Sequence, residues 1–230
     1  MAKYVFLNMP LQGHVNPTLA VAQELVNRGQ EVSYYLTEEF RNAVQATGVT
    51  FRPYESQIPS SRQVTIDTSL SASSMFRLIG IGPRMLEETR YVLPQVMERI
   101  RAEQPDAIIY DFLCFWALKV VDELQVPAIS TRATYASNEH FSLFEQVRKS
   151  FADNPEALAL VAKIRETRAE EAVFPAANFF GVISRVAPLN IVFISREFQP
   201  AGETFDERYL FVGPPILPRY QPVPFPFEKL

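Results

Sequence analysis

Short apolar runs alternate with longer amphipathic segments along this 230-residue chain, and this alternation limits the possible folds more than any other feature. The runs at 3–9, 31–36 and 106–111 are rich in β-branched and aromatic residues, as buried strands are. Between the first two, apolar residues recur at helical spacing until Gly29. Repeated strand–helix–strand units predict an α/β fold with a doubly wound, Rossmann-like parallel sheet.

The same pattern gives the remaining expected elements. Further strands are predicted at 49–53, 128–131, 190–194 and 209–212. Helices are predicted from residue 37, over 75–102 with interruptions near 80–83 and 94, over 116–124, and over much of 138–171. The polar residues 55–73 are expected to form a long surface loop.

The turn after the first strand contains His14, one of two histidines in the chain. Asn16 and Pro17 follow it, and Asn is a favoured N-cap while Pro suits the first helical position, so a helix is predicted to begin there. If the strand order is 3-2-1-4-5, the first and fourth strands are neighbours at the switch point. His14 and Asp111, which ends the fourth strand, would then meet at one crevice.

An imidazole beside a carboxylate suits general base catalysis, because the carboxylate fixes the tautomer and stabilises the imidazolium. The positive end of the following helix is expected to oppose early protonation of His14. The alternative is that His14 is an ordinary capping or hydrogen-bonding residue near a helix start.

Composition and absent motifs exclude several classes of function. A net charge of −4 does not favour nucleic acid as a partner, and the single cysteine excludes an internal disulfide or a multi-cysteine zinc site. His14 and His140 have no ligand-spaced partners, so no metal is expected. The first apolar run is too short for a signal peptide or a membrane span, which suggests a cytoplasmic protein. The chain has no G-x-G-x-x-G, P-loop lysine or G-x-S-x-G motif.

Three apolar groups follow predicted strands on the side of the sheet where His14 is expected. They could line a wide pocket for a large hydrophobic ligand, or they could simply pack the core. The groups are Met75, Phe76, Leu78, Ile79, Met85 and Leu86; then Phe112, Phe115 and Trp116; then Tyr135, Phe141 and Phe144.

Four blocks carry a family resemblance in the correct order: GHVNPTLAVAQELVNRGQEVSYYLTEEF, PDAIIYDF, TYASNEHF and LNIVFISREFQPAGETFDERYLFVGPPI. They resemble family 1 glycosyltransferases of the GT-B fold, and among these the bacterial macrolide and flavonoid enzymes. The resemblance covers essentially the whole chain. It implies the N-terminal domain of such an enzyme, which binds the acceptor.

The resemblance also implies roles for individual residues. His14 would deprotonate an acceptor hydroxyl with help from Asp111, and the oxygen would displace UDP from a UDP-sugar, expected to be UDP-glucose, with inversion and without a metal. Gly13 and Thr134 would lie near the donor, although Arg132 and Ala133 fit the family pattern loosely. The residues expected around a hydrophobic acceptor are Met75, Phe76, Leu78, Phe112, Trp116, Tyr135, Asn138 and Phe141.

The family pattern continues into a donor-binding C-terminal domain that this sequence lacks. Residues 1–212 are therefore expected to form the acceptor-binding domain, and the proline-rich residues 213–230 to form an interdomain linker. A fragment of a glycosyltransferase is expected rather than a natural half-enzyme. The alternatives are a binding module for a lipophilic small molecule, and a subunit that needs a separate donor-binding chain. An exposed cleft face also suggests self-association.

Overall fold

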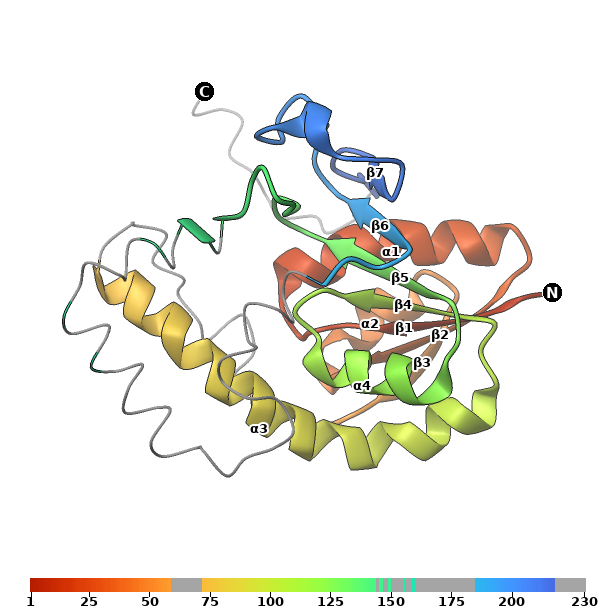
Figure 1. Ribbon diagram of the computed structural model, residues 1–230. Helices are drawn as coiled ribbons and strands as arrows, with labels where there is room; N and C mark the ends of the chain where they lie inside the picture. The colour runs from red at the N-terminus through yellow and green to blue at the C-terminus, as the bar shows by residue number, and fades with distance from the viewer. Residues whose placement is uncertain are drawn as a thin grey trace, which may run out of the picture.

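A computed structural model describes residues 1–58, 72–143 and 185–217 together with scattered positions over 145–159, and the side chains of residues 72–83 are not described. This part of the chain forms a sheet of seven strands in the order β3-β2-β1-β4-β5-β6-β7 (Figure 1). Every neighbouring pair is parallel. The α/β class and the predicted order of the first five strands are therefore confirmed. The strands are β1 (Lys3–Leu7), β2 (Glu31–Leu36), β3 (Thr50–Pro53), β4 (Ala107–Asp111), β5 (Ala128–Arg132), β6 (Leu189–Val192) and β7 (Tyr209–Phe211).

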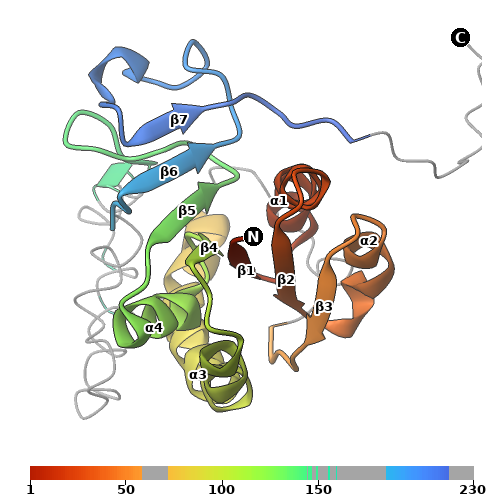
Figure 2. The same cartoon turned by 90° about the vertical axis from the view of Figure 1, so that its right-hand side faces the viewer.

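Helices cover both faces of the sheet (Figure 2). One face carries α1 (Gln12–Asn27) and α2 (Arg41–Gln45), and the other carries α3 (Ala72–Glu103) and α4 (Phe115–Leu124). Two short 3₁₀ turns, η1 (Glu38–Phe40) and η3 (Gly202–Thr204), complete the described elements. Alternate residues of each strand serve the two faces, since Phe6 packs on the α1 side while Val5 and Leu7 pack on the α3 side. The strands are buried on both sides, which explains their nearly continuous apolar sequences.

The predicted start of α1 was wrong. The helix begins at Gln12 with Leu11 as an extended N-cap, and Pro17 lies inside it. The local preference of Asn16 and Pro17 for a helix start is overridden, because the backbone N–H groups of His14 and Val15 both donate to the Leu11 carbonyl at 2.9 Å. Pro17 gives up only the helical hydrogen bond to the residue one turn earlier. His14 consequently lies in the first turn of the helix instead of in the loop before it.

The predicted interruptions of the long helix near residues 80–83 and 94 were also wrong, because α3 is continuous from Ala72 to Glu103. Around Pro94, the side chains of Val92, Val96 and Ile100 are fully buried against the core. Their burial outweighs the intrinsic cost of a proline within a helix.

Several predictions fall on residues that are not described. Residues 59–71 of the predicted loop, most of the predicted helix over 138–171, and residues 218–230 of the predicted linker lie outside the described part of the chain. Among the helices that are described, none has the length and apolarity needed to cross a membrane.

A buried polar network ties the end of β1 to α1 and β2. The amide nitrogen of Asn8 donates to the Tyr34 hydroxyl at 2.8 Å and to the Thr18 hydroxyl at 3.1 Å. The two hydroxyls lie 2.6 Å apart, and Tyr54 donates its hydroxyl to the Asn8 carbonyl at 2.8 Å. Asn8 also donates to the carbonyl of His14 at 3.4 Å. This network fixes the first turn of α1 on the sheet.

Replacing the centre of this network should destabilise the fold. Asn8→Ala leaves buried hydroxyl groups with fewer partners, and we expect the free energy of unfolding to fall by about 2 kcal/mol. Urea denaturation followed by circular dichroism measures the change. Glu24→Ala, which breaks an exposed ion pair with Arg28 on the same helix, should cost about 0.5 kcal/mol or less. Equal losses in the two variants would contradict the role given to the network.

Candidate functional site

The parallel pairing of β1 with β4 creates the candidate site. Leu7 lies opposite Tyr110 in the register of these two strands, so both strands end at the same edge of the sheet. The chain then turns into α1 after β1, and Asp111 ends β4. This edge is the switch point of the doubly wound sheet, where such folds bind ligands.

His14 and Asp111 meet there directly. Nδ1 of His14 lies 2.7 Å from Oδ2 of Asp111, and the other carboxylate oxygen accepts the Leu113 backbone N–H at 2.9 Å. Asp111 is 1% exposed and the His14 side chain is 13% exposed. When Nδ1–H donates to the carboxylate, Nε2 of the neutral ring carries the lone pair. Nε2 has no hydrogen-bond partner among the described residues, and it is therefore available to a ligand hydroxyl.

Two opposing effects act on the pKa of His14. Burial of the ring is the largest single effect and lowers the pKa, but the charge of Asp111 and the hydrogen bond with it both raise it. The pKa of His14 is raised overall. The expectation that the helix terminus keeps the ring unprotonated is thus corrected, because a partial charge at a helix end is weaker than a full carboxylate in contact.

Phe112 and Arg132 extend the contacts of the histidine. The Phe112 ring stacks on the imidazole, with 5.9 Å between ring centroids and 24° between planes. The guanidinium carbon of Arg132 lies 5.2 Å from the centre of the same phenyl ring. Sequence reasoning placed Phe112 near the ligand but gave Arg132 no role. No signal in the sequence pattern pointed to Arg132, since its surroundings come from strands and loops far apart in the chain.

The predicted apolar residues fall into different places. Trp116 is fully buried in the core and packs edge-on against Tyr54, so for this residue the core interpretation holds. Tyr135 is half-buried and packs edge-on against Phe141 and in a stack with Phe198, with centroids 5.8 and 6.0 Å apart. Phe198, which follows β6 and is 67% exposed, was missed by the sequence reasoning. The side chains of Met75, Phe76 and Leu78 are outside the described residues.

Asn138 has its amide group occupied within the protein. Its nitrogen donates to the Thr204 hydroxyl at 2.8 Å, and its oxygen accepts the backbone N–H groups of His140 and Phe141 at 2.9 Å each. These bonds hold the turn that carries Phe141. Asn138 therefore helps to fix the position of Phe141, whose ring packs against Tyr135.

The two residues expected near a donor are both on the surface. Gly13 is exposed in the first turn of α1, and a side chain built at this position would meet open space. That turn contains no acidic residue and its N-cap side chain makes no capping bond. Thr134 is exposed just beyond the carboxyl end of β5.

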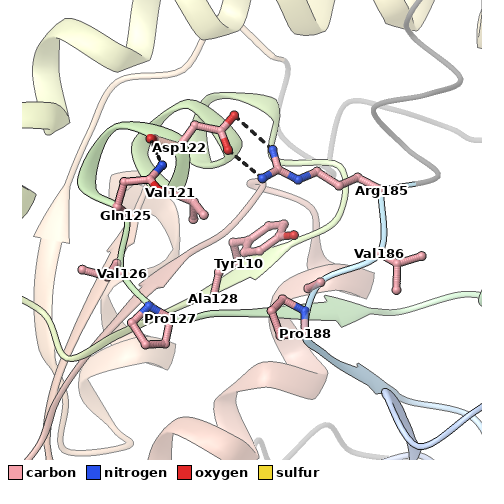
Figure 3. A pocket seen from close by; sticks show the side chains of 11 residues that line it. Tyr110, Val121, Asp122, Gln125, Val126, Pro127, Ala128, Arg185, Val186 and Pro188 are labelled. Carbon is pink, nitrogen blue, oxygen red and sulfur yellow. Dashed lines mark hydrogen bonds and ion pairs between the residues drawn. The ribbon is translucent and has the colours of Figure 1, made fainter.

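A cavity of about 230 Å³ lies away from the dyad, where the chain enters β5 and β6 (Figure 3). Its wall includes Tyr110, Pro127 and Pro188, together with Arg185, whose guanidinium makes two bonds to the Asp122 carboxylate at 2.6 and 3.0 Å. None of the predicted site residues lines this cavity. Within the described part of the chain, no group of three or more His, Cys, Asp and Glu side chains could hold a metal ion.

Comparison with known proteins gives a consistent result. The chain is 35% identical to NDP-glycosyltransferase YjiC of Bacillus licheniformis over 92% of this chain and 51% of that protein. It is 31% identical to demethyllactenocin mycarosyltransferase of Streptomyces fradiae, over 93% of this chain and 47% of the relative. The crystal structure of the calicheamicin glycosyltransferase CalG4 matches with a TM-score of 0.68 and 27% identity, covering 98% of this chain and 56% of CalG4.

The predicted resemblance to GT-B glycosyltransferases is confirmed. No protein-family model matches the chain. The chain spans about half the length of the curated glycosyltransferases that it matches, which is consistent with an N-terminal half. The Rossmann-like sheet of this chain thus resembles the fold of about half of a GT-B glycosyltransferase.

The contact with Asp111 should make the stability contribution of His14 depend on pH. A raised pKa in the folded state means that the contribution is fully present below the unfolded pKa of histidine, about 6.5, and is lost as pH rises through the folded value. We expect the difference in unfolding free energy between the native chain and His14→Gln to shrink as the pH rises above about 6.5. Urea denaturation at several pH values measures it.

The exposed second histidine provides the control for this measurement. His140→Gln removes the same chemical group from an exposed site, where the imidazole pairs with the exposed Glu139. A difference for His14→Gln that grows with pH would contradict the raised pKa.

Proposed function

We propose that this chain is the acceptor-binding half of an inverting, NDP-sugar-dependent glycosyltransferase, with His14 as the general base. The contact between His14 and Asp111 carries the proposal, because it uses Nδ1 and leaves Nε2 without a hydrogen-bond partner among the described residues, on a partly exposed side chain at the ligand-binding edge of the sheet. In the reaction, Nε2 takes the proton of an acceptor hydroxyl while that oxygen attacks the anomeric carbon. The bond from that carbon to the nucleotide diphosphate breaks, and the configuration inverts.

Asp111 has a separate task in this mechanism. Its carboxylate holds the imidazole with Nε2 outward and stabilises the imidazolium that forms when the proton arrives. It is itself held by the Leu113 backbone N–H, which fixes the direction of the carboxylate plane. Because the hydroxyl proton passes to the histidine, no metal is needed for that step.

The acceptor is proposed to be a hydrophobic small molecule such as a macrolide or a flavonoid. Support comes from the aromatic side chains of Tyr135, Phe141 and Phe198, which follow β5 and β6 and are partly or largely exposed. Phe112 itself is buried against His14. Aromatic rings in this position bind flat apolar molecules through large contact areas. The relative in Streptomyces fradiae is named for transfer to demethyllactenocin, which agrees with such an acceptor class.

The donor is proposed to be a UDP-sugar, with UDP-glucose as the first candidate, held mainly by a second domain. Gly13 and Thr134 would face its diphosphate and sugar. The first turn of α1 supports this placement, because N–H groups at a helix start attract anions, and the helix itself has no acidic residue in that turn.

Removing the base should abolish transfer without removing the acceptor. The chain is joined to the remaining half of Bacillus licheniformis YjiC, and transfer from UDP-glucose to a panel of flavonoids and macrolide aglycones is followed by mass spectrometry. We expect His14→Ala to lower the rate about 10²- to 10⁴-fold while the dissociation constant of the acceptor, measured by calorimetry, stays within a few-fold. Asp111→Asn should show the same pattern, because it leaves the imidazole without its orienting charge.

Two outcomes would favour other readings. Transfer at the native rate by His14→Ala would exclude this histidine as the base. Acceptor binding without transfer, even with the second half attached, would favour a binding module for lipophilic molecules. His140→Gln is the control, since that imidazole is exposed and pairs with Glu139 instead of Asp111.

A further inference from the structure

Arg132 is buried with most of its hydrogen-bonding capacity unused. It is 1% exposed, and among its side-chain nitrogens Nη2 donates to the Arg185 carbonyl at 2.9 Å, whereas Nε and Nη1 have no partner. No carboxylate pairs with it in the described part of the chain. Burying a guanidinium in this way is costly. Its position at the last residue of β5, beside the site, suggests that the charge serves the site.

Arg132 also contacts the ring of Phe112. Its guanidinium carbon lies 5.2 Å from the centre of that ring, within the range of a cation–π interaction. The same ring stacks on the imidazole of His14. Imidazole and guanidinium therefore share one aromatic platform, which follows directly after Asp111 in the chain.

We propose that Arg132 is a positioning residue for His14, acting through Phe112: the guanidinium holds the phenyl ring against the imidazole and its charge disfavours the imidazolium. This inference rests on the proposed role of His14 as the base. Asp111 orients the ring at Nδ1, and the phenyl face limits its tilt. With the Nδ1 edge of the imidazole held by Asp111 and one face of the ring held by Phe112, Nε2 keeps a fixed direction. A fixed direction of the base favours efficient proton transfer.

The charge of Arg132 acts in the opposite direction to that of Asp111. Asp111 raises the pKa of His14. A buried cation close to the imidazole is expected to oppose that rise, because like charges disfavour the protonated form. Burial lowers the pKa of Arg132 itself, but a guanidinium stays protonated at any working pH. Tyr110 of β4 and Tyr209 of β7 also act on Arg132, and burial raises the pKa of both hydroxyls. Other ionisable groups near the dyad include Tyr34 from β2, Cys114 before α4 and Glu88 from α3. Burial raises the pKa of each of them, so Tyr34 and Cys114 are neutral at neutral pH.

Proton NMR of the two histidines tests the proposal in the chain as it stands. His140→Gln assigns the imidazole signals, and the titration of His14 is then followed in Arg132→Gln, Arg132→Lys and Phe112→Leu. We expect Arg132→Gln to raise the pKa of His14 and Arg132→Lys to restore it toward the native value. Phe112→Leu should move the His14 ring protons downfield, because the shielding by the stacked phenyl ring is lost.

A control separates a specific effect from the loss of any arginine that lies over a phenylalanine ring, although the residue concerned, Arg196, is exposed. Arg196 also lies over a phenylalanine ring, with 4.6 Å to the centre of Phe211, and donates to the carbonyls of Gly202 and Phe205. Arg196→Gln should lower stability without changing the titration of His14. If Arg132→Gln and Arg196→Gln move the His14 titration equally, or if neither moves it, the proposal is overturned.

If Arg132→Gln does not fold, proton NMR of Arg132 in the native chain tests the proposal instead. The Nε–H proton of Arg132 should resonate upfield and exchange slowly with water, because it is buried beside an aromatic ring. A fast-exchanging signal at the usual position would overturn the proposal. None of these readouts depends on sugar transfer. Failure of His14→Ala to stop transfer would therefore remove the proposed function while leaving this stack to be judged separately.

Discussion

The parallel pairing of β1 with β4 is the constraint on which the rest of the structure depends. The chain passes through β2, β3 and the long α3 before it returns to the other side of β1. Because both strands run in the same direction, their carboxyl ends lie at one edge, and the register places Asp111 one step beyond the pair of Leu7 and Tyr110. A single turn of α1 then suffices to bring His14 into contact. The backbone topology brings His14 and Asp111 close together, and their side chains complete the contact.

Polar groups are buried together at this edge, and their mutual hydrogen bonds hold its shape. Asn8, Thr18 and Tyr34 satisfy one another beneath the first turn of α1, while Asp111 divides its two oxygens between His14 and a backbone N–H. In a low-dielectric interior such networks are strong when complete and costly when broken. The consequence is a rigid support for a histidine that itself remains partly exposed.

The sequence pattern was sufficient for those features that depend on periodicity and topology. The positions of β1, β2 and β4, the order of the first five strands, and the neighbourhood of His14 and Asp111 all follow from apolar runs and the rules for parallel sheets. The start of α1 was misplaced because Asn16 and Pro17 have strong local preferences, whereas the actual start depends on contacts of the first turn with β1. The continuity of α3 past Pro94 likewise depends on core burial.

Other features could not be read from the sequence because they arise from residues distant in the chain. The surroundings of Arg132 combine Phe112 after β4 with the carbonyl of Arg185 before β6. Because Trp116 follows β4, the sequence suggested that it lines a pocket. In the structure, its side chain on α4 points into the core and packs against Tyr54. In both cases the strand order can be inferred, but the direction of a side chain on a helix or strand end requires the packed structure.

In the proposed function, this chain contains both the base and the carboxylate that orients it, whereas the nucleotide sugar would bind mainly to the rest of the protein. The proposed base and the carboxylate that orients it are both anchored in one sheet, so the proton chemistry is set before any nucleotide sugar arrives. A raised pKa strengthens the base but leaves a larger fraction of it protonated near neutral pH, and these two effects oppose each other in a general base. A cation held behind an aromatic ring, close to the imidazole but shielded from water, is a means of adjusting that balance without blocking Nε2. In the proposed function, the half that binds the acceptor would therefore tune its base independently of the part of the protein that binds the nucleotide sugar.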